Sequence, residues 1–136
     1  MKKLLLILSI PLFLFSNQTF SKEEQFVCEY NREVKVTDME SQNLKPFVNK
    51  KTERYTFIVE GNKGSYINLS HGIKSPMTLI VNGKQLIFVE NNTGDNSFIV
   101  TIFLDKRKNN KYPSIYSTHS WGSGFYTPSQ QYGECN

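Results

Sequence analysis

The side chains best suited to binding chemistry gather in the last third of the chain. Tyr116, Trp121, Phe125 and Tyr126 are interleaved there with serine, threonine, glycine and glutamine. Aromatic rings with a polar handle and small neighbours suit carbohydrate stacking or a protein interface. The alternative is that these rings pack the closing strands of a β domain. As a binding site, we predict Trp121, Phe125 and Tyr126 around the glycine-containing loop 121–124, with Tyr116 nearby.

No residue pattern in the sequence indicates catalysis or metal binding. His71 and His119 are far apart, and neither has other ligands at metal-binding spacing. Gly122-Ser123-Gly124 lacks the residue between each glycine and the serine that a nucleophile elbow requires. Zinc-protease, phosphate-loop and dinucleotide fingerprints are missing from the sequence. We therefore predict a non-catalytic protein that needs no cofactor and no metal.

The charge balance argues against nucleic acid as a partner. The formal net charge is only +4, and two of the positive charges, Lys2 and Lys3, belong to the first few residues. A nucleic-acid-binding domain usually carries a large basic patch. The one basic cluster, residues 106–108 with Lys111, lies between two strand-like runs. It is typical of a solvated turn, with contact to an acidic surface as the alternative.

The N-terminus has the pattern of an export signal. Two lysines precede an apolar stretch, residues 4–15, that is too short for a membrane-spanning helix. We predict a signal peptide over residues 1–21, cut after Ser21, and a single all-β domain over residues 22–136. No other stretch is apolar and long enough to span a bilayer. The prediction is a periplasmic or secreted monomer without integral membrane association.

Two cysteines remain, and their positions predict how the domain is closed. Cys28 lies near the start of the predicted domain and Cys135 next to the last residue. In an exported chain two such cysteines are expected to form a disulfide. This bond would join the first strand to the last.

Short alternating runs separated by turn residues predict an antiparallel all-β fold. The strongest signal is Asn82-Gly83 between two apolar runs, which predicts a two-residue hairpin loop pairing Val81 with Lys84. In residues 98–104, Phe98, Val100, Ile102 and Leu104 form an uninterrupted apolar face, and this run is expected to form a central strand. Other such runs bring the total to seven or eight strands. We predict a small antiparallel β-barrel or sandwich and favour the barrel, because a first-to-last disulfide lies where a meander would close.

One outline resemblance accompanies this pattern. The early Phe26-x-Cys28-x-Tyr30 strand and the terminal Tyr132-Gly-x-Cys135 occur in an exported domain that is similar in size and strand count to the periplasmic inhibitors of c-type lysozyme. The resemblance implies a small barrel with few cysteines. The Ser-Gly-x-x-Tyr loop associated with those inhibitors is absent, since the tyrosine of residues 123–126 comes one place early. No functional residue is carried over.

We therefore predict a non-catalytic binding module of the bacterial envelope or exterior. Its partner would be a protein or glycan of the cell envelope, and inhibition of a wall-degrading or proteolytic enzyme is one form this role could take. The alternative is a lipocalin-like barrel that carries a small apolar ligand. In that case Phe88, Phe98 and Ile102 would line a cavity instead of packing against one another.

Overall fold

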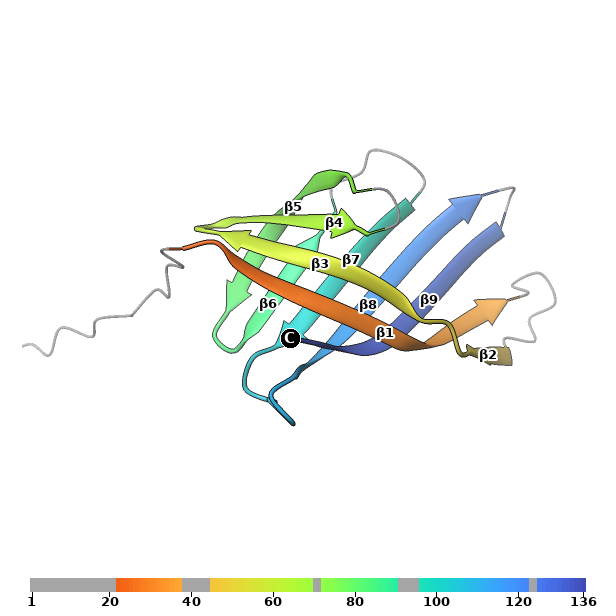
Figure 1. Ribbon diagram of the computed structural model, residues 1–136. Helices are drawn as coiled ribbons and strands as arrows, with labels where there is room; N and C mark the ends of the chain where they lie inside the picture. The colour runs from red at the N-terminus through yellow and green to blue at the C-terminus, as the bar shows by residue number, and fades with distance from the viewer. Residues whose placement is uncertain (1–21, 38–44, 70–71, 91–95, 123–124) are drawn as a thin grey trace, which may run out of the picture.

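The computed structural model describes residues 22–37, 45–69, 72–90, 96–122 and 125–136, and the predicted signal peptide lies outside them. Within these ranges the chain forms nine strands (Figure 1). They are β1 (Glu24–Thr37), β2 (Lys45–Asn49), β3 (Glu53–Glu60), β4 (Lys63–Asn68), β5 (Lys74–Asn82), β6 (Gln85–Val89), β7 (Asn96–Phe103), β8 (Tyr112–Gly122) and β9 (Phe125–Cys135). The all-β prediction is confirmed.

Eight of the described strands close into an antiparallel barrel. The order runs from β1 through β3, β4, β5, β6, β7 and β8 to β9, which pairs back with β1. On the edge opposite β9, the long strand β1 pairs with two strands. Its first half pairs with β3, from Glu24↔Val59 to Tyr30↔Glu53, and its second half pairs with β2. In Figure 1, β1 runs across the front of the barrel, and β8 and β9 lie side by side behind its second half.

The hairpin between β5 and β6 forms one residue later than the sequence predicts. The structure pairs Asn82 with Gln85 and leaves Gly83 and Lys84 as the turn, so the predicted register is wrong. Gly83 takes a φ of 55°, and glycine at the first loop position is characteristic of a type II′ turn. Strand faces are preserved, because Leu79 now pairs with Phe88 and both still face the core.

The barrel interior is filled by side chains over most of its length. Phe57, Leu86, Phe88, Val100 and Ile102 are each 0% exposed. Aromatic rings continue this core toward the end formed by β3 and β8. There the rings of Tyr55 and Tyr116 stack, with centroids 5.2 Å apart and planes 5° from parallel. This part of the interior is a packed core.

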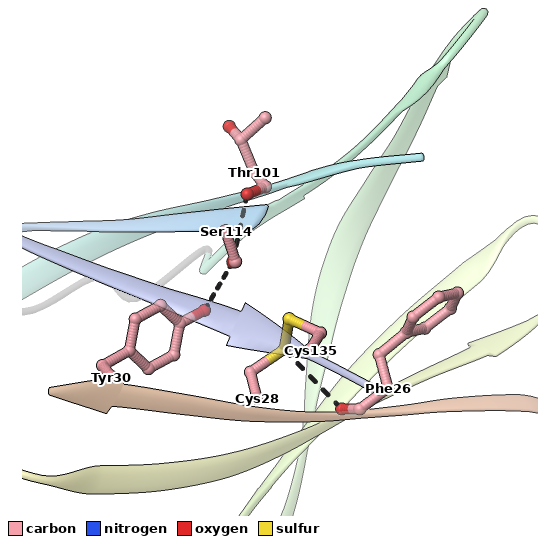
Figure 2. The surroundings of a disulfide bond; sticks show 6 residues. All are labelled: Phe26, Cys28, Tyr30, Thr101, Ser114 and Cys135. Atoms are coloured by element: carbon pink, nitrogen blue, oxygen red, sulfur yellow. Dashed lines mark hydrogen bonds between the residues drawn. A yellow bond between two sulfur atoms is a disulfide. The ribbon is translucent and has the colours of Figure 1, made fainter. Parts of the chain in front are cut away.

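The predicted disulfide is present and closes the barrel. Cys28 and Cys135 are register partners on β1 and β9, and both are fully buried (Figure 2). Beside them Tyr30 bonds Ser114 Oγ at 2.7 Å, and Ser114 donates to the carbonyl oxygen of Thr101 at 3.1 Å. The Tyr30 hydroxyl is therefore the donor in the first bond. A disulfide of this kind indicates an oxidising, non-cytoplasmic environment.

No helix in the described ranges is both long and apolar enough to cross a bilayer.

Candidate functional site

An irregularity in β1 directs a charged side chain into the barrel. Up to Tyr30, alternate residues of β1 face the core, as Cys28 does. A β-bulge follows, because β9 pairs Gly133 with Tyr30 but Tyr132 with Arg32. The extra residue reverses the alternation, so Glu33 lies inside and is only 4% exposed. Bulges are known to redirect side chains in this way near functional sites.

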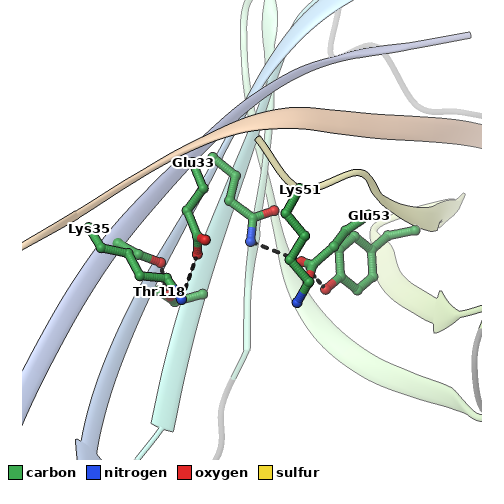
Figure 3. A network of polar contacts seen from close by, with 8 residues as sticks. Glu33, Lys35, Lys51, Glu53 and Thr118 are labelled. Atoms are coloured by element: carbon green, nitrogen blue, oxygen red, sulfur yellow. Dashed lines mark hydrogen bonds and ion pairs between the residues drawn. The ribbon is translucent and has the colours of Figure 1, made fainter. Parts of the chain in front are cut away.

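The redirected glutamate lines a pocket at the end of the barrel beyond the aromatic core. The pocket has a volume of about 200 Å³. We call it the polar pocket, and its lining comes from four strands: Glu33 and Lys35 of β1, Glu53 of β3, Tyr116 and Thr118 of β8, and Ser129 and Gln131 of β9. Figure 3 shows Glu33 and Lys35 approaching from β1, with Glu53 and Lys51 opposite them. Residues distant in sequence therefore meet only because the barrel closes.

Glu53 is fully provided with hydrogen-bond donors. One carboxylate oxygen contacts Lys51 Nζ at 2.5 Å, and the other accepts from Gln131 Nε2 at 2.9 Å and from the Tyr55 hydroxyl at 3.0 Å. Burial raises the pKa of Glu53, but the bonds from Lys51, Gln131 and Tyr55 together outweigh it and lower the pKa below its ordinary value. Glu53 is therefore a fixed carboxylate that holds its neighbours in place.

Two other polar atoms of the pocket have no such partners. Glu33 Oε1 lies 3.3 Å from Lys35 Nζ, but Glu33 Oε2 is buried and has no hydrogen-bond partner among the described residues. Gln131 Oε1 is also buried and also lacks a hydrogen-bond partner among the described residues, and Gln131 as a whole is 6% exposed. Exchanging the positions of the Gln131 amide oxygen and nitrogen would not improve the hydrogen bonding. The oxygen would then lie against the Glu53 carboxylate, which cannot donate to it. Both unsatisfied atoms are hydrogen-bond acceptors.

These two atoms distinguish the polar pocket from other hollows in the surface. Within the described part of the chain, they are the buried side-chain polar atoms that lack a partner. A larger hollow of about 510 Å³, lined by residues of β3 and β4 with the segment before β3, includes neither Glu33 nor Gln131. Unsatisfied buried acceptors are uncommon in folded proteins and call for a specific explanation. They therefore single out the polar pocket as the candidate functional site.

The sequence-predicted aromatic residues relate to this pocket in two ways. Tyr116, 8% exposed, lines the pocket and stacks on Phe98 as well as Tyr55, so it belongs to both the core and the site. Burial, reinforced by neighbouring Tyr55, raises the pKa of Tyr116 above its usual range, so the hydroxyl stays neutral.

The other three predicted residues lie where β8 turns into β9. Trp121 pairs with Tyr126, and Gly122 with Phe125, so the strands continue into the predicted loop. The side chains of Trp121, Phe125 and Tyr126 lie outside the described residues, as does all of His71. On the backbone, Trp121 is three residues beyond Thr118 of the polar pocket, about 10 Å along the strand. The hairpin end therefore extends past the same end of the barrel.

The polar residues of the pocket could not be predicted from the sequence. Glu33, Glu53 and Gln131 are scattered through the chain, and no motif links them. The one local signal was the exposed polar pair Asn31-Arg32, which interrupts the alternation of β1 just before Glu33. The described residues contain no cluster of three or more histidine, cysteine, aspartate or glutamate side chains that could hold a metal ion.

The Glu53 network predicts an acid-sensitive contribution to stability. Because its pKa is lowered in the folded state, Glu53 stabilises the fold above its ordinary pKa of 4.5, and this contribution is lost as the pH falls through the lowered value. Urea denaturation at pH 7, 4 and 3 should show a smaller loss of stability on acidification for Glu53→Gln than for the natural protein. The control is Glu60→Gln on the exposed end of β3, which should keep the natural profile. Equal acid sensitivity of all three proteins would contradict the assignment.

Comparison of this chain with protein-family models, with curated proteins and with solved structures found no match. The outline resemblance to lysozyme inhibitors therefore has no matched sequence or structure behind it. The chemistry of the polar pocket is the remaining basis for a functional proposal.

Proposed function

We propose that this chain is an exported, non-catalytic binding module of the bacterial envelope or exterior, and that its partner docks at the polar pocket. The observation that carries the proposal is the pair of buried acceptors without donors, on Glu33 and Gln131. Leaving such an atom unsatisfied costs about 1–3 kcal/mol, and a ligand that donates to it recovers that free energy. A periplasmic or secreted location agrees with the buried disulfide and with the export signal predicted from the sequence.

The state of the Glu53 carboxylate favours binding over hydrolysis. Glycoside hydrolases also use two carboxyl groups in one pocket, and they keep one of these groups protonated through a raised pKa. Glu53 has the opposite shift, because its donors lower its pKa despite burial. The neutral hydroxyl of Tyr116 offers no base. These groups are suited to recognise a ligand and poorly suited to transfer protons to it.

The position of the pocket favours a protein as the partner. The hairpin end of β8 and β9, which carries Trp121, Phe125 and Tyr126, extends past the pocket on the same end of the barrel. A partner surface in contact with this end could place one side chain in the pocket. Inhibition of a wall-degrading or proteolytic enzyme is a role of this kind.

The alternative role, a carrier of a small apolar ligand, has less support. Phe88, Phe98 and Ile102 would have to surround such a ligand, yet all three belong to one continuous buried cluster. Phe88 packs on Phe57 with ring centroids 5.1 Å apart, and Phe98 packs on Tyr66 at 5.0 Å. Opening a cavity there would require these contacts to be lost.

The proposal predicts that blocking the pocket prevents partner binding. Thr118→Tyr places a large side chain in the pocket lining, and its control, Thr78→Tyr, makes the same change at an exposed position of β5. Each protein is immobilised and exposed to an envelope extract of the source cells, and the retained proteins are quantified by mass spectrometry. The retained amount of a specific partner should be at least tenfold lower with Thr118→Tyr than with the natural protein, and unchanged with Thr78→Tyr. Trp121→Ala tests the hairpin end in the same assay and should weaken retention without loss of folding.

Folding of each variant is checked by near-ultraviolet circular dichroism before the capture. A partner retained equally by the natural protein and by folded Thr118→Tyr would place binding elsewhere on the barrel. If Trp121→Ala retains the partner as well as the natural protein does, the hairpin end is not part of the contact, and the pocket is unaffected by this result. Native mass spectrometry of the protein from its own compartment tests the carrier role, since a bound apolar molecule would add a discrete mass.

A further inference from the structure

We propose that the polar pocket is a receptor for a guanidinium group, the end of an arginine side chain presented by a protein partner. This inference rests on the proposed binding function and specifies its ligand. It follows from the kind of atom left unsatisfied, the ion pairs around it, and the size and shape of the pocket.

The unsatisfied atoms call for a ligand that donates hydrogen bonds. Glu33 Oε2 and Gln131 Oε1 are both acceptors, and the donors of Gln131 and Lys51 are already directed at Glu53. A guanidinium group carries five N–H donors and no acceptor. It can therefore satisfy both oxygens without adding an acceptor that itself needs a partner.

The ion pairs of the pocket leave one carboxylate oxygen without a donor. Glu53 is engaged by the ammonium of Lys51, which is 59% exposed, and Glu33 Oε1 lies 3.3 Å from Lys35 Nζ. Glu33 Oε2 is buried and has no hydrogen-bond partner among the described residues. A sugar would supply hydroxyl donors but no positive charge. A cation both donates to the buried Glu33 carboxylate and compensates its charge, and such charge-assisted bonds are about twice as strong as neutral ones.

The dimensions of the site fit a side-chain end group. Its volume of about 200 Å³ is below the range of roughly 300–1,000 Å³ that holds complete small-molecule ligands. Glu33 and Gln131 are direct register partners on β1 and β9, which places their Cβ atoms about 5 Å apart. The two side chains therefore start side by side, and a planar fork can bridge neighbouring acceptors, whereas the ammonium of lysine acts as a point charge.

The test uses Nα-acetyl-arginine methylamide as the probe in an NMR titration of the ¹⁵N-labelled protein. Its matched probes are the citrulline derivative, which has the same shape without the charge, the lysine derivative, and methyl N-acetylglucosaminide as the sugar. We expect the arginine probe to shift the side-chain amide signals of Gln131 and the backbone signal of Thr118. The citrulline and sugar probes should bind at least tenfold more weakly, and the lysine probe should fall between them and arginine.

Variants assign the binding to the buried carboxylate. Glu33→Gln should weaken the arginine probe about tenfold. Its control is Glu29→Gln on the same strand, where Glu29 pairs with Arg54 on the outer surface, and it should bind as the natural protein does. Lys35→Met should bind the arginine probe several-fold more tightly, because the Lys35 ammonium competes for Glu33. The citrulline comparison requires no variant, so misfolding of Glu33→Gln would not weaken the test.

Three results would overturn the inference. These are no shift of pocket signals at the solubility limit of the arginine probe, equal binding of citrulline, and tighter binding of the sugar. If any of them occurs while Thr118→Tyr still abolishes partner capture, the ligand class is wrong and the docking site stands. If capture is also insensitive to Thr118→Tyr, the proposed function fails with it.

Discussion

Replacing Gly133 by alanine is expected to destabilise the barrel more than any other single small substitution considered above, by about 3 kcal/mol or more. A Cβ at this position would lie 2.1 Å from the carbonyl oxygen of Glu29 and 2.8 Å from Cα of Tyr30. Both contacts are with the backbone of β1, which cannot rotate away as a side chain can. The strand pair β1–β9 that closes the barrel would have to separate locally.

Urea denaturation of Gly133→Ala measures this effect, and Gly64→Ala provides the comparison. A Cβ at Gly64 would also be crowded, at 2.9 Å from Cδ1 of Phe88, but that atom belongs to a ring that can shift. We therefore expect Gly64→Ala to cost distinctly less than Gly133→Ala. If the two variants lose equal stability, or if Gly133→Ala loses less, the close approach of β9 to β1 at the bulge is wrong.

Removing the disulfide is expected to have the largest effect of all, a loss of about 4–5 kcal/mol in the free energy of unfolding. The bond joins residues separated by 107 positions, so its loss frees almost the whole domain in the unfolded state. The chain-entropy model places the penalty for a loop of this size near the top of the usual range. The double variant Cys28→Ser, Cys135→Ser replaces both fully buried sulfur atoms with small polar groups and adds a desolvation cost.

Urea denaturation with and without prior reduction checks this prediction. The natural protein, when its disulfide is reduced in the unfolded state, should lose nearly as much free energy of unfolding as the double serine variant. The two losses should differ only by the cost of burying the serine hydroxyls. The folded, oxidised protein should resist dithiothreitol, because both sulfur atoms are fully buried. If reduction leaves the urea midpoint unchanged, the prediction is wrong, and the hydrogen bonds between β1 and β9 are sufficient to close the barrel.

Both predictions concern the strand pair that also builds the polar pocket. Along β1, Cys28 is bonded to β9, Tyr30 meets Gly133 at the bulge, and Glu33 faces Gln131. The covalent bond and the close glycine contact thus hold the backbone that presents the two unsatisfied acceptors. A rigid support of this kind limits the freedom of functional side chains and reduces the ordering cost of binding.

The sequence by itself determined the features that depend on local periodicity and on composition. Alternation in residues 98–104 placed Phe98, Val100 and Ile102 on the core face, and the structure confirms all three as buried. With only Cys28 and Cys135 available, the disulfide had one possible pairing. The hairpin at Gly83 kept its strand faces although Val81 pairs with Leu86 and not with Lys84, because a shift of two residues preserves the strand period.

Only the tertiary structure decided the candidate site. The bulge after Tyr30 arises where β1 meets β9, at the far end of the chain, and it alone turns Glu33 inward. Pairing across the barrel closure then brings Gln131 beside Glu33, and Gln131 in turn bonds Glu53. Strand periodicity is a local property of the sequence, whereas a bulge and a closing register depend on contacts between residues far apart in the chain. For this physical reason the sequence predicted the barrel and its disulfide, and the polar pocket became visible only in the folded protein.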